Sequence, residues 1–358
     1  MITARALARR AVSAAAYYSG LEGQRHRVAM QDRGVVLMYH RVLPDAPHPG
    51  VDPGMFVTAS AFEHHLRLLR SRYDLVTIDA FGEWMTGQRV LTRPPCAITF
   101  DDGWRDNYTM ALPVLREARV PATVFLVSEA TEHDRLFWPE DVVTKTHHVA
   151  QRQGPALALN ALADLWPDSQ ARPSVSAPGT FCEHWVEALK LIAEDERRSR
   201  INDYLRRIGV SVEPLIGYIM TWDQAREMSA YGIAFGSHTH THKILEGLDE
   251  TEAMSELTVS RSIISNELQC DVDLFCYPNA RYTGSEGALL ARCGYRYGFI
   301  IDGRQVGRAI DPFYVPRFLM SEEVARNRDY VSLHLLEAPL YAGRPHRPRS
   351  TMQPAGVS

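Results

Sequence analysis

The 358-residue sequence predicts an α/β fold, a distorted β/α barrel with a helical insertion. Two observations support this. Strand-like apolar runs alternate with helix-like segments over most of the chain. Four of these runs also end directly in polar residues of the kinds that carry out chemistry. In a β/α barrel the active site lies on the face where the strands have their C-terminal ends, so the four runs are expected to meet there.

The first of these runs to carry a clear chemical pattern is 96–100, which ends in Asp101, Asp102 and Gly103. A carboxylate is costly to bury without a partner, so packing does not explain two of them at a strand end. Successive strand side chains point to opposite faces, and one acid could hold a metal while the other handles a proton. An Asp-Asp-Gly turn is the alternative, and the motif alone does not separate the two.

A second run, 233–235, is followed by Gly-Ser-His-Thr-His-Thr-His at 236–242. Histidine is a common metal ligand, and zinc-like ions take two or three imidazoles with a carboxylate. A tight loop would bring His238 and His242 to one ion, whereas an extended segment would place His238, His240 and His242 on one face. The cluster favours metal binding, with the aspartate pair as the source of the carboxylate.

The other two runs are weaker signals by themselves. The run 35–39 ends in His40 and Arg41, and the run 274–277 ends in Pro278, Asn279, Ala280 and Arg281. Their agreement with the first two runs is what predicts a common site.

These motifs together resemble the polysaccharide deacetylase family, whose catalytic domain is of the NodB type. Thr-Phe-Asp-Asp-Gly at 99–103 resembles the first family motif, and His238-Thr-x-x-His242 resembles the second. Phe-Cys-Tyr-Pro-Asn at 275–279 resembles the third. The resemblance covers about residues 34 to 320 apart from a divergent middle section, and it implies the deacetylase type of barrel.

The resemblance also implies roles for individual residues. Asp102, His238 and His242 would bind one divalent metal ion, with zinc expected, and Asp101 would be the general base that activates the attacking water. The backbone N–H of Asn279 would stabilise the oxyanion, in a loop whose Tyr277 and Pro278 are candidate substrate-binding residues.

Departures from the common family pattern affect the expected acid and the arginine that orients the catalytic aspartate. The leaving amine needs a histidine as its acid, and the order of motifs resembles a circularly permuted, exopolysaccharide-type subgroup, which assigns His40 to that role. His334 is interpreted as structural. The arginine that orients the catalytic aspartate is replaced by Cys276, and Arg317, in an Asp-Pro…Pro-Arg stretch, is the candidate substitute. Arg41 and Arg281 are weaker candidates.

The predicted organisation has three parts. Residues 1–33 form an N-terminal helical segment, 34–342 form the barrel and 343–358 form a disordered tail. Within the barrel, 130–218 is a helical insertion, interpreted as a lid near the active-site mouth. Elsewhere Ser60 is expected to cap one helix, Thr221-x-x-Gln224 predicts a capping box, and 249–268 predicts a long amphipathic helix.

Composition restricts the class of protein. A hydrophobic content of 45% is enough for a large core, and a net charge of −4 argues against a nucleic-acid binder. Five cysteines without a CxxC pair are read as free thiols in a reducing compartment. No export signal is recognised, so a cytoplasmic location is expected, with peripheral membrane contact through the Arg-rich N-terminus as an option.

The predicted function is metal-dependent removal of N-acetyl groups from amino sugars of a polysaccharide, oligosaccharide or lipid-linked glycan. The expected partner is therefore an N-acetylated glycan or glycoconjugate. Alternatives on the same fold are a metal-dependent amidase, an esterase acting on O-acetylated sugars and a non-catalytic glycan-binding protein.

Overall fold

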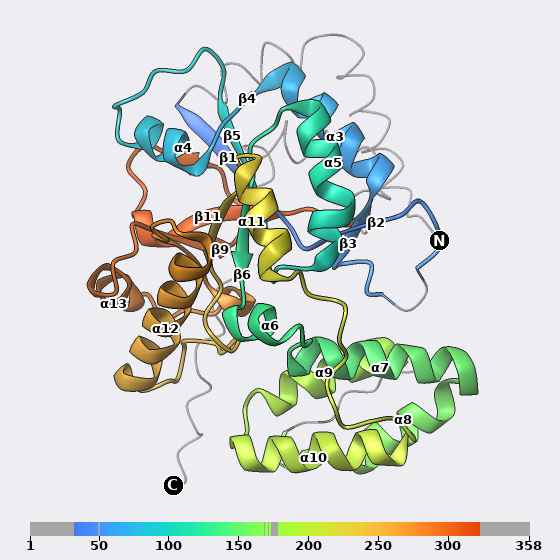
Figure 1. The fold of residues 1–358 in the computed structure, drawn as a ribbon. Helices are drawn as coiled ribbons and strands as arrows, with labels where there is room; N and C mark the ends of the chain where they lie inside the picture. Colours follow the sequence, from blue (N-terminus) through green and yellow to red (C-terminus); the bar gives the residue numbers. More distant parts are fainter. Residues whose placement is uncertain (1–31, 49–50, 168, 171, 173–177, 323–358) are drawn as a thin grey trace, which may run out of the picture.

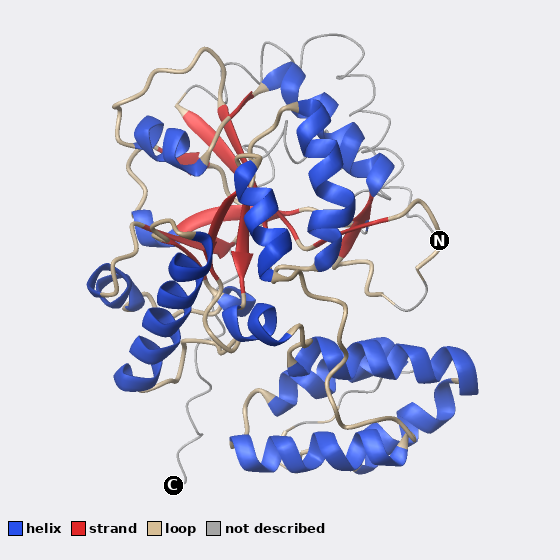
Figure 2. Ribbon diagram, in the orientation of Figure 1, coloured by secondary structure: helices blue, strands red, loops and turns tan. Residues whose placement is uncertain are grey.

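The structure is a computed structural model that describes residues 32–48, 51–167, 169–170, 172 and 178–322. Seven parallel strands of this part of the chain form a closed ring, because β1 pairs with β11 on one side and with β5 on the other. Helices surround the ring (Figures 1 and 2). The predicted fold class, a β/α barrel with a helical insertion, is confirmed. Of the predicted segment 1–33, only residues 32 and 33 are described. The predicted tail 343–358 and His334 lie outside the described residues.

The barrel follows the order β1-β11-β9-β8-β7-β6-β5 around the ring. Its strands are β1 (Arg33–Tyr39), β5 (Pro95–Phe100), β6 (Thr123–Leu126), β7 (Ala234–Ser237), β8 (Leu274–Cys276), β9 (Tyr297–Ile301) and β11 (Val315–Leu319). Four short strands lie outside the ring: β2 (Arg41–Leu43), β3 (Phe56–Thr58), β4 (Asp74–Leu75) and β10 (Val306–Gly307). All four strands that the sequence analysis singled out, β1, β5, β7 and β8, belong to the ring.

Helices connect the strands. Around the barrel they are α3 (Ala59–Arg72), α4 (Ile78–Met85), α5 (Leu112–Ala118), α6 (Ser128–His133), α11 (Trp222–Ala230), α12 (Glu250–Leu268) and α13 (Glu286–Arg292). The insertion contributes α7 (Trp138–Gln153), α8 (Pro155–Asp164), α9 (Pro178–Leu189) and α10 (Glu194–Arg207). The short helical turns are η1 (Asn107–Ala111), η2 (Pro278–Ala280) and η3 (Pro312–Tyr314).

The residues at the N-termini of the helices can be compared with the predicted N-caps. The capping box of Thr221 and Gln224 is present in both directions at the start of α11, and Asp249 caps α12. The prediction for Ser60 is wrong. Thr58 caps α3 by accepting from the N–H of Ala61, and Ser60 lies inside the first turn, where its hydroxyl donates to Asp45.

The helical insertion leaves the barrel between β6 and β7. Its two ends meet at a neck, where the N–H of Leu136 donates to the carbonyl of Leu215 at 2.8 Å. In Figure 1 the helices α7–α10 form a group beside the end of the barrel towards which the β6 arrow points. The group has its own apolar core around Trp185 and Tyr204. The insertion is thus a small helical unit at the C-terminal side of the strands.

The barrel strands are buried on both faces. One apolar cluster lies between the ring and the helices α3, α5, α11 and α12. A second apolar cluster lies between α4 and the strands of the ring. All five cysteines are free thiols, and four of them are buried. Among the described residues, no helix combines the length and the apolar character needed to cross a membrane.

Candidate active site

The strand register brings the predicted residues to one end of the barrel. Tyr39 at the end of β1 pairs with Phe100 at the end of β5, and Leu126 pairs with Ser237 at the end of β7. Ser237 in turn pairs with Phe275 in β8. The residues that follow these strand ends therefore share the C-terminal face of the barrel, where β/α barrels carry their sites.

Three of the predicted residues form a compact group. Oδ1 of Asp102 lies 3.5 Å from Nε2 of His238 and 3.5 Å from Nε2 of His242. A tetrahedral zinc ion with bonds of about 2.0–2.2 Å separates its ligand atoms by about 3.4 Å. One carboxylate and two imidazoles at these separations fit a divalent metal and leave a position for substrate or water.

His238 is oriented and protonated as a metal ligand needs to be. Its Nδ1 lies 2.8 Å from the carbonyl oxygen of Cys276, and a carbonyl only accepts, so Nδ1 carries the proton and Nε2 keeps its lone pair. Burial lowers the pKa of His238 to about 4, so its imidazole is neutral near pH 7. Phe137 lies over the other imidazole, with its ring centroid 4.4 Å from that of His242.

The loop that carries the histidines is held from behind by α12. Glu256 accepts the backbone N–H groups of His240 and Thr241 at 2.9 and 2.8 Å. His240 turns away from the group, because its Nδ1 bonds to the hydroxyl of Ser128 at 2.9 Å. The loop is not extended, since Thr239 and His242 have positive φ values of 65° and 61°. This geometry pairs His238 with His242, as the motif resemblance implied.

Asp101 forms a buried, two-pronged ion pair with Arg317 of β11. The two guanidinium nitrogens donate to Oδ1 and Oδ2 of Asp101, each at 2.7 Å, and Arg317 also donates to the hydroxyl of Thr99. Burial opposes ionisation of Asp101, but the charge and hydrogen bonds of Arg317 lower the pKa of Asp101 below its usual value. The other arginines considered from the sequence pair elsewhere, Arg41 with Asp106 and Arg281 with Glu246.

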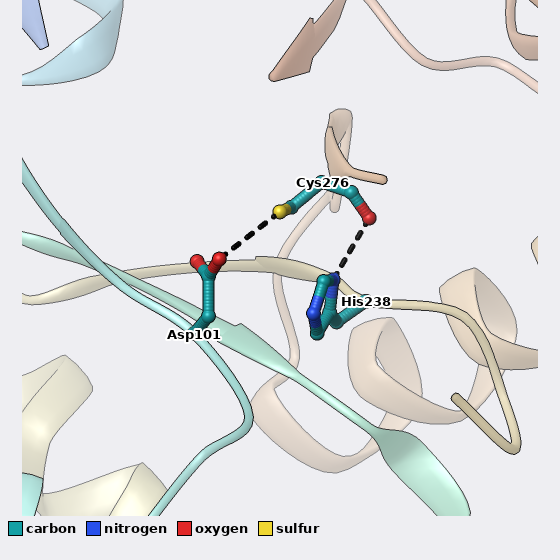
Figure 3. Close-up of side chains that lie close together, drawn as sticks. All are labelled: Asp101, His238 and Cys276. Carbon is teal, nitrogen blue, oxygen red and sulfur yellow. Dashed lines mark hydrogen bonds between the residues drawn. The ribbon is translucent and has the colours of Figure 1, made fainter. Parts of the chain in front are cut away.

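Cys276 lies beside the same ion pair, and Figure 3 shows its thiol directed towards the Asp101 carboxylate. Its Sγ lies 3.3 Å from Oδ2 of Asp101 and 2.8 Å from a guanidinium nitrogen of Arg317. Asp101, His238 and Cys276 thus form a second group of metal-ligand type among the described residues. A cation there would face the Arg317 guanidinium, and burial raises the pKa of the Cys276 thiol, which opposes the thiolate. The group of Asp102, His238 and His242 is the better metal site.

His40 follows β1 at the same end of the barrel. Burial opposes ionisation of Asp101 and Asp102, and the electrostatic interaction with His40 is among the causes that lower the pKa of both carboxyl groups. Its Nδ1 is buried and has no hydrogen-bond partner among the described residues. The backbone carbonyl of His40 accepts from Asn107 at 2.8 Å, which fixes the strand end. An imidazole that interacts electrostatically with two carboxylates can serve as a proton donor.

The loop after β8 carries the predicted substrate-binding residues. Asn279 has a positive φ of 56° in the turn that Pro278 begins, and its side chain is exposed. Its Nδ2 lies 3.4 Å from Oε1 of Glu187 in the insertion. Tyr277 is only 1% exposed, with its ring stacked on Tyr314. Tyr277 therefore supports the loop from inside, and the substrate-binding roles of these residues stay predictions.

Glu140, in the first turn of α7, is a candidate that sequence reasoning missed. Burial and the negative charge of Asp102 raise the pKa of Glu140 to about 7, whereas Lys190 and Arg41 act in the opposite sense. Its neighbour Asp141 is paired with Lys145 at 2.7 Å. No sequence motif marks Glu140, because only the folding of the insertion brings it near the barrel residue Asp102.

This raised pKa makes a testable prediction for the metal-free protein. In the folded protein Glu140 keeps its proton up to about pH 7, whereas in the unfolded protein its side chain ionises near pH 4.5. Glu140 therefore lowers the free energy of unfolding progressively as pH rises from 4.5 to 7, and this loss of stability persists at higher pH. Glu140→Gln should raise the Tm by a few degrees, on the order of 2–5 °C, at pH 8 and should leave it unchanged at pH 4. Thermal unfolding followed by circular dichroism measures this difference.

Glu63→Gln, which alters an exposed carboxylate on α3, is the control and should shift the Tm equally little at both pH values. A Glu140→Gln protein no more stable than wild type at pH 8 contradicts the prediction.

Comparison with known proteins agrees with this geometry. The family model described as polysaccharide deacetylase matches residues 88–155 and 183–298, slightly more than half of the chain. His40 and Arg317 lie outside the matched ranges. A Bacillus subtilis (strain 168) protein, YxkH, whose name describes it as a polysaccharide deacetylase, is 21% identical over 264 residues. The match covers 74% of this chain, which spans 62% of the length of that relative.

Solved structures share the fold. The Streptococcus pyogenes deacetylase PplD, solved in complex with acetate, has a TM-score of 0.55 and 16% identity, covering 85% of this chain and 98% of its own. IcaB from Ammonifex degensii has a TM-score of 0.53 and 20% identity, covering 84% and 97%. At these identities the likeness concerns the fold. The family match, the motifs and the barrel agree, and the chain belongs to the polysaccharide deacetylase family.

Proposed function

We propose that this protein is a metal-dependent hydrolase that removes N-acetyl groups from the amino sugars of a glycan or glycoconjugate. The observation that carries the proposal is that a possible metal site and a buried ion pair involve two adjacent aspartates at the end of β5. Asp102 faces His238 and His242 with separations that fit a metal ion, and Asp101, the adjacent residue, is held as a carboxylate by Arg317. Family membership supports the reaction class.

In this proposal Asp102, His238 and His242 hold the ion. A divalent ion bound there, with zinc expected, would polarise the acetyl carbonyl and make water more acidic. Asp101 accepts a proton from the attacking water, and Arg317 keeps Asp101 ionised and fixed in orientation. The close fit of Arg317 leaves Asp101 little freedom to rotate, which favours a base over a second metal ligand.

The remaining steps fall to groups around the ion. The backbone N–H of Asn279 stabilises the developing oxyanion. His40 donates a proton to the leaving amine, because an amide anion is a very poor leaving group. The electrostatic interaction of His40 with both aspartates supports this role, and its buried Nδ1 has no hydrogen-bond partner among the described residues. The proposal also includes the circularly permuted motif order and a cytoplasmic location, with peripheral membrane contact through the N-terminus as an option.

The test is acetate release by the purified protein on a matched panel. The panel contains N-acetylglucosamine oligomers, N-acetylated glycolipid precursors, simple amides and O-acetylated sugars. Release from N-acetylated sugars, stopped by a chelator and restored by Zn²⁺, supports the proposal. Exclusive release from O-acetylated sugars or simple amides would favour the esterase or the amidase instead. Glycan binding without any release would indicate a non-catalytic protein.

Metal content separates the two groups of candidate ligands. His242→Ala removes a ligand of the proposed group only, and it should lower the zinc content of the purified protein by about tenfold or more. Cys276→Ser changes the other group and should leave the zinc content near that of wild type. Inductively coupled plasma mass spectrometry gives both values. Loss of zinc from Cys276→Ser with zinc kept in His242→Ala would reverse the assignment.

A further inference from the structure

The two carboxylate oxygens of Asp102 have different surroundings. Oδ1 faces the imidazole nitrogens of His238 and His242, each at 3.5 Å. Oδ2 instead accepts the indole N–H of Trp104 at 3.0 Å. Trp104 is only 1% exposed, and its indole has this single polar group. One oxygen is thus turned to the metal position and the other is occupied by a fixed donor.

The Trp104 ring is itself held in place. The guanidinium of Arg41 lies 4.2 Å from the ring centroid, as in a cation–π contact. Arg41 donates through Nε to Asp106 at 2.8 Å, and Asp106 also accepts the backbone N–H of Val42 at 2.9 Å. The two charged side chains are only 13% and 11% exposed. A largely buried ion pair therefore fixes Arg41 against the indole.

The backbone around Trp104 adds to this restraint. Asp102 has a positive φ of 74°, an unusual conformation that needs support from its surroundings. Trp104 forms an antiparallel bridge with Ile219, and Met220 donates its N–H to the carbonyl of Gly103 at 2.9 Å. The segment after the paired aspartates is thus tied both to β2, through Arg41 and Val42, and to the loop that precedes α11.

We infer that Trp104 is a positioning residue for the metal site, a role that rests on the proposed function. Its N–H restrains Asp102 to binding through one oxygen and sets the direction of that oxygen. Outer hydrogen bonds of this kind typically change metal affinity by about 10- to 100-fold. Arg41 and Asp106 act one step further out, by holding the indole plane.

The experiment measures Zn²⁺ affinity of the whole protein by competition with a chromophoric chelator. Trp104→Phe keeps an aromatic ring and removes the N–H, and it should weaken Zn²⁺ binding by about 10- to 100-fold. The matched control is Trp84→Phe. Trp84 is 4% exposed and lies under Arg308 with the guanidinium 5.2 Å from its ring, but it belongs to α4 and to none of the metal-ligand groups. The control should bind Zn²⁺ as wild type does.

A second replacement separates positioning from packing. Incorporation of 3-benzothienylalanine at position 104 keeps the two-ring shape and removes only the N–H, so it should weaken Zn²⁺ binding like Trp104→Phe while leaving the Tm of the metal-free protein near that of wild type. The visible spectrum of bound Co²⁺ should also change, because that spectrum reports ligand geometry.

The outcomes are distinct. Wild-type affinity in the benzothienyl protein overturns the role of Trp104 and leaves the proposed function standing. If Trp84→Phe weakens Zn²⁺ binding equally, the effect is one of general packing, and the positioning role of Trp104 is likewise overturned. If the wild-type protein binds no Zn²⁺, the proposed function fails and this inference fails with it.

Discussion

Asp101→Asn is expected to lower the rate of acetate release by about 10²- to 10⁴-fold, the range in which a general base contributes. The amide has nearly the shape of the carboxylate but cannot accept a proton from water. Bound zinc should stay near the wild-type amount, because the proposed ligands are Asp102, His238 and His242. The measurement is kcat/KM on the best substrate of the panel, together with metal content.

The matched control is Asp134→Asn. Asp134 is also paired with an arginine, Arg105 at 2.9 Å, but the pair is about one-third exposed. This control should keep activity within about twofold of wild type, in line with the small effect of exposed ion pairs. Full activity in Asp101→Asn would reject Asp101 as the base, and loss of zinc from that variant would assign Asp101 to the metal instead.

Arg317→Met is expected to lower the free energy of unfolding by about 3–5 kcal/mol at pH 7.5, because it leaves Asp101 buried without its counter-charge. The effect should shrink at low pH. In wild type the lowered pKa of Asp101 gives stability above the unfolded pKa, and this stability is lost as pH falls. In the variant Asp101 takes up a proton more readily, so the two proteins converge in acid.

Urea unfolding of both proteins at pH 7.5 and pH 4.5 measures these differences. Arg292→Met breaks an exposed pair with Glu250, in which the side chains are 56% and 65% exposed, and should cost less than about 1 kcal/mol at either pH. The double variant Arg317→Met with Asp101→Asn should recover part of the lost stability, because no buried charge is left over. A loss below about 1 kcal/mol in Arg317→Met would show that the ion pair contributes little.

Much of the fold and part of the site were accessible from sequence patterns. The runs before His40, Asp101, His238 and Pro278 are strands, and their register places the following residues at one end of the barrel. Local patterns worked where the interaction is local, as in the capping box of Thr221 and Gln224. The cap at Ser60 was predicted wrongly because Thr58, two residues earlier, offers the same chemistry.

Other features could not be derived from local patterns. Cys276 stands where the family pattern has an arginine, and only closure of the ring brings Arg317 from β11 onto Asp101, 216 positions away in sequence. By residue type alone either His240 or His242 could join His238, and only the motif resemblance favours His242. Their environments differ because His240 is bound by residues of other elements. Ser128 forms a hydrogen bond with its side chain, and Glu256 accepts its backbone N–H. Glu140 approaches Asp102 only through the packing of the insertion.

The barrel class, the strand ends that carry polar groups and the family resemblance of the motifs can be predicted from the order of residues alone. These features depend on residue type and short spacing, which a linear pattern records. Which side chains face one another depends on the folded barrel: Arg317 faces Asp101, His238 and His242 face one oxygen of Asp102, and Trp104 faces the other. The physical reason is that charge pairing and hydrogen bonding act over a few ångströms, and only the closed ring of strands brings residues so distant in sequence within that range.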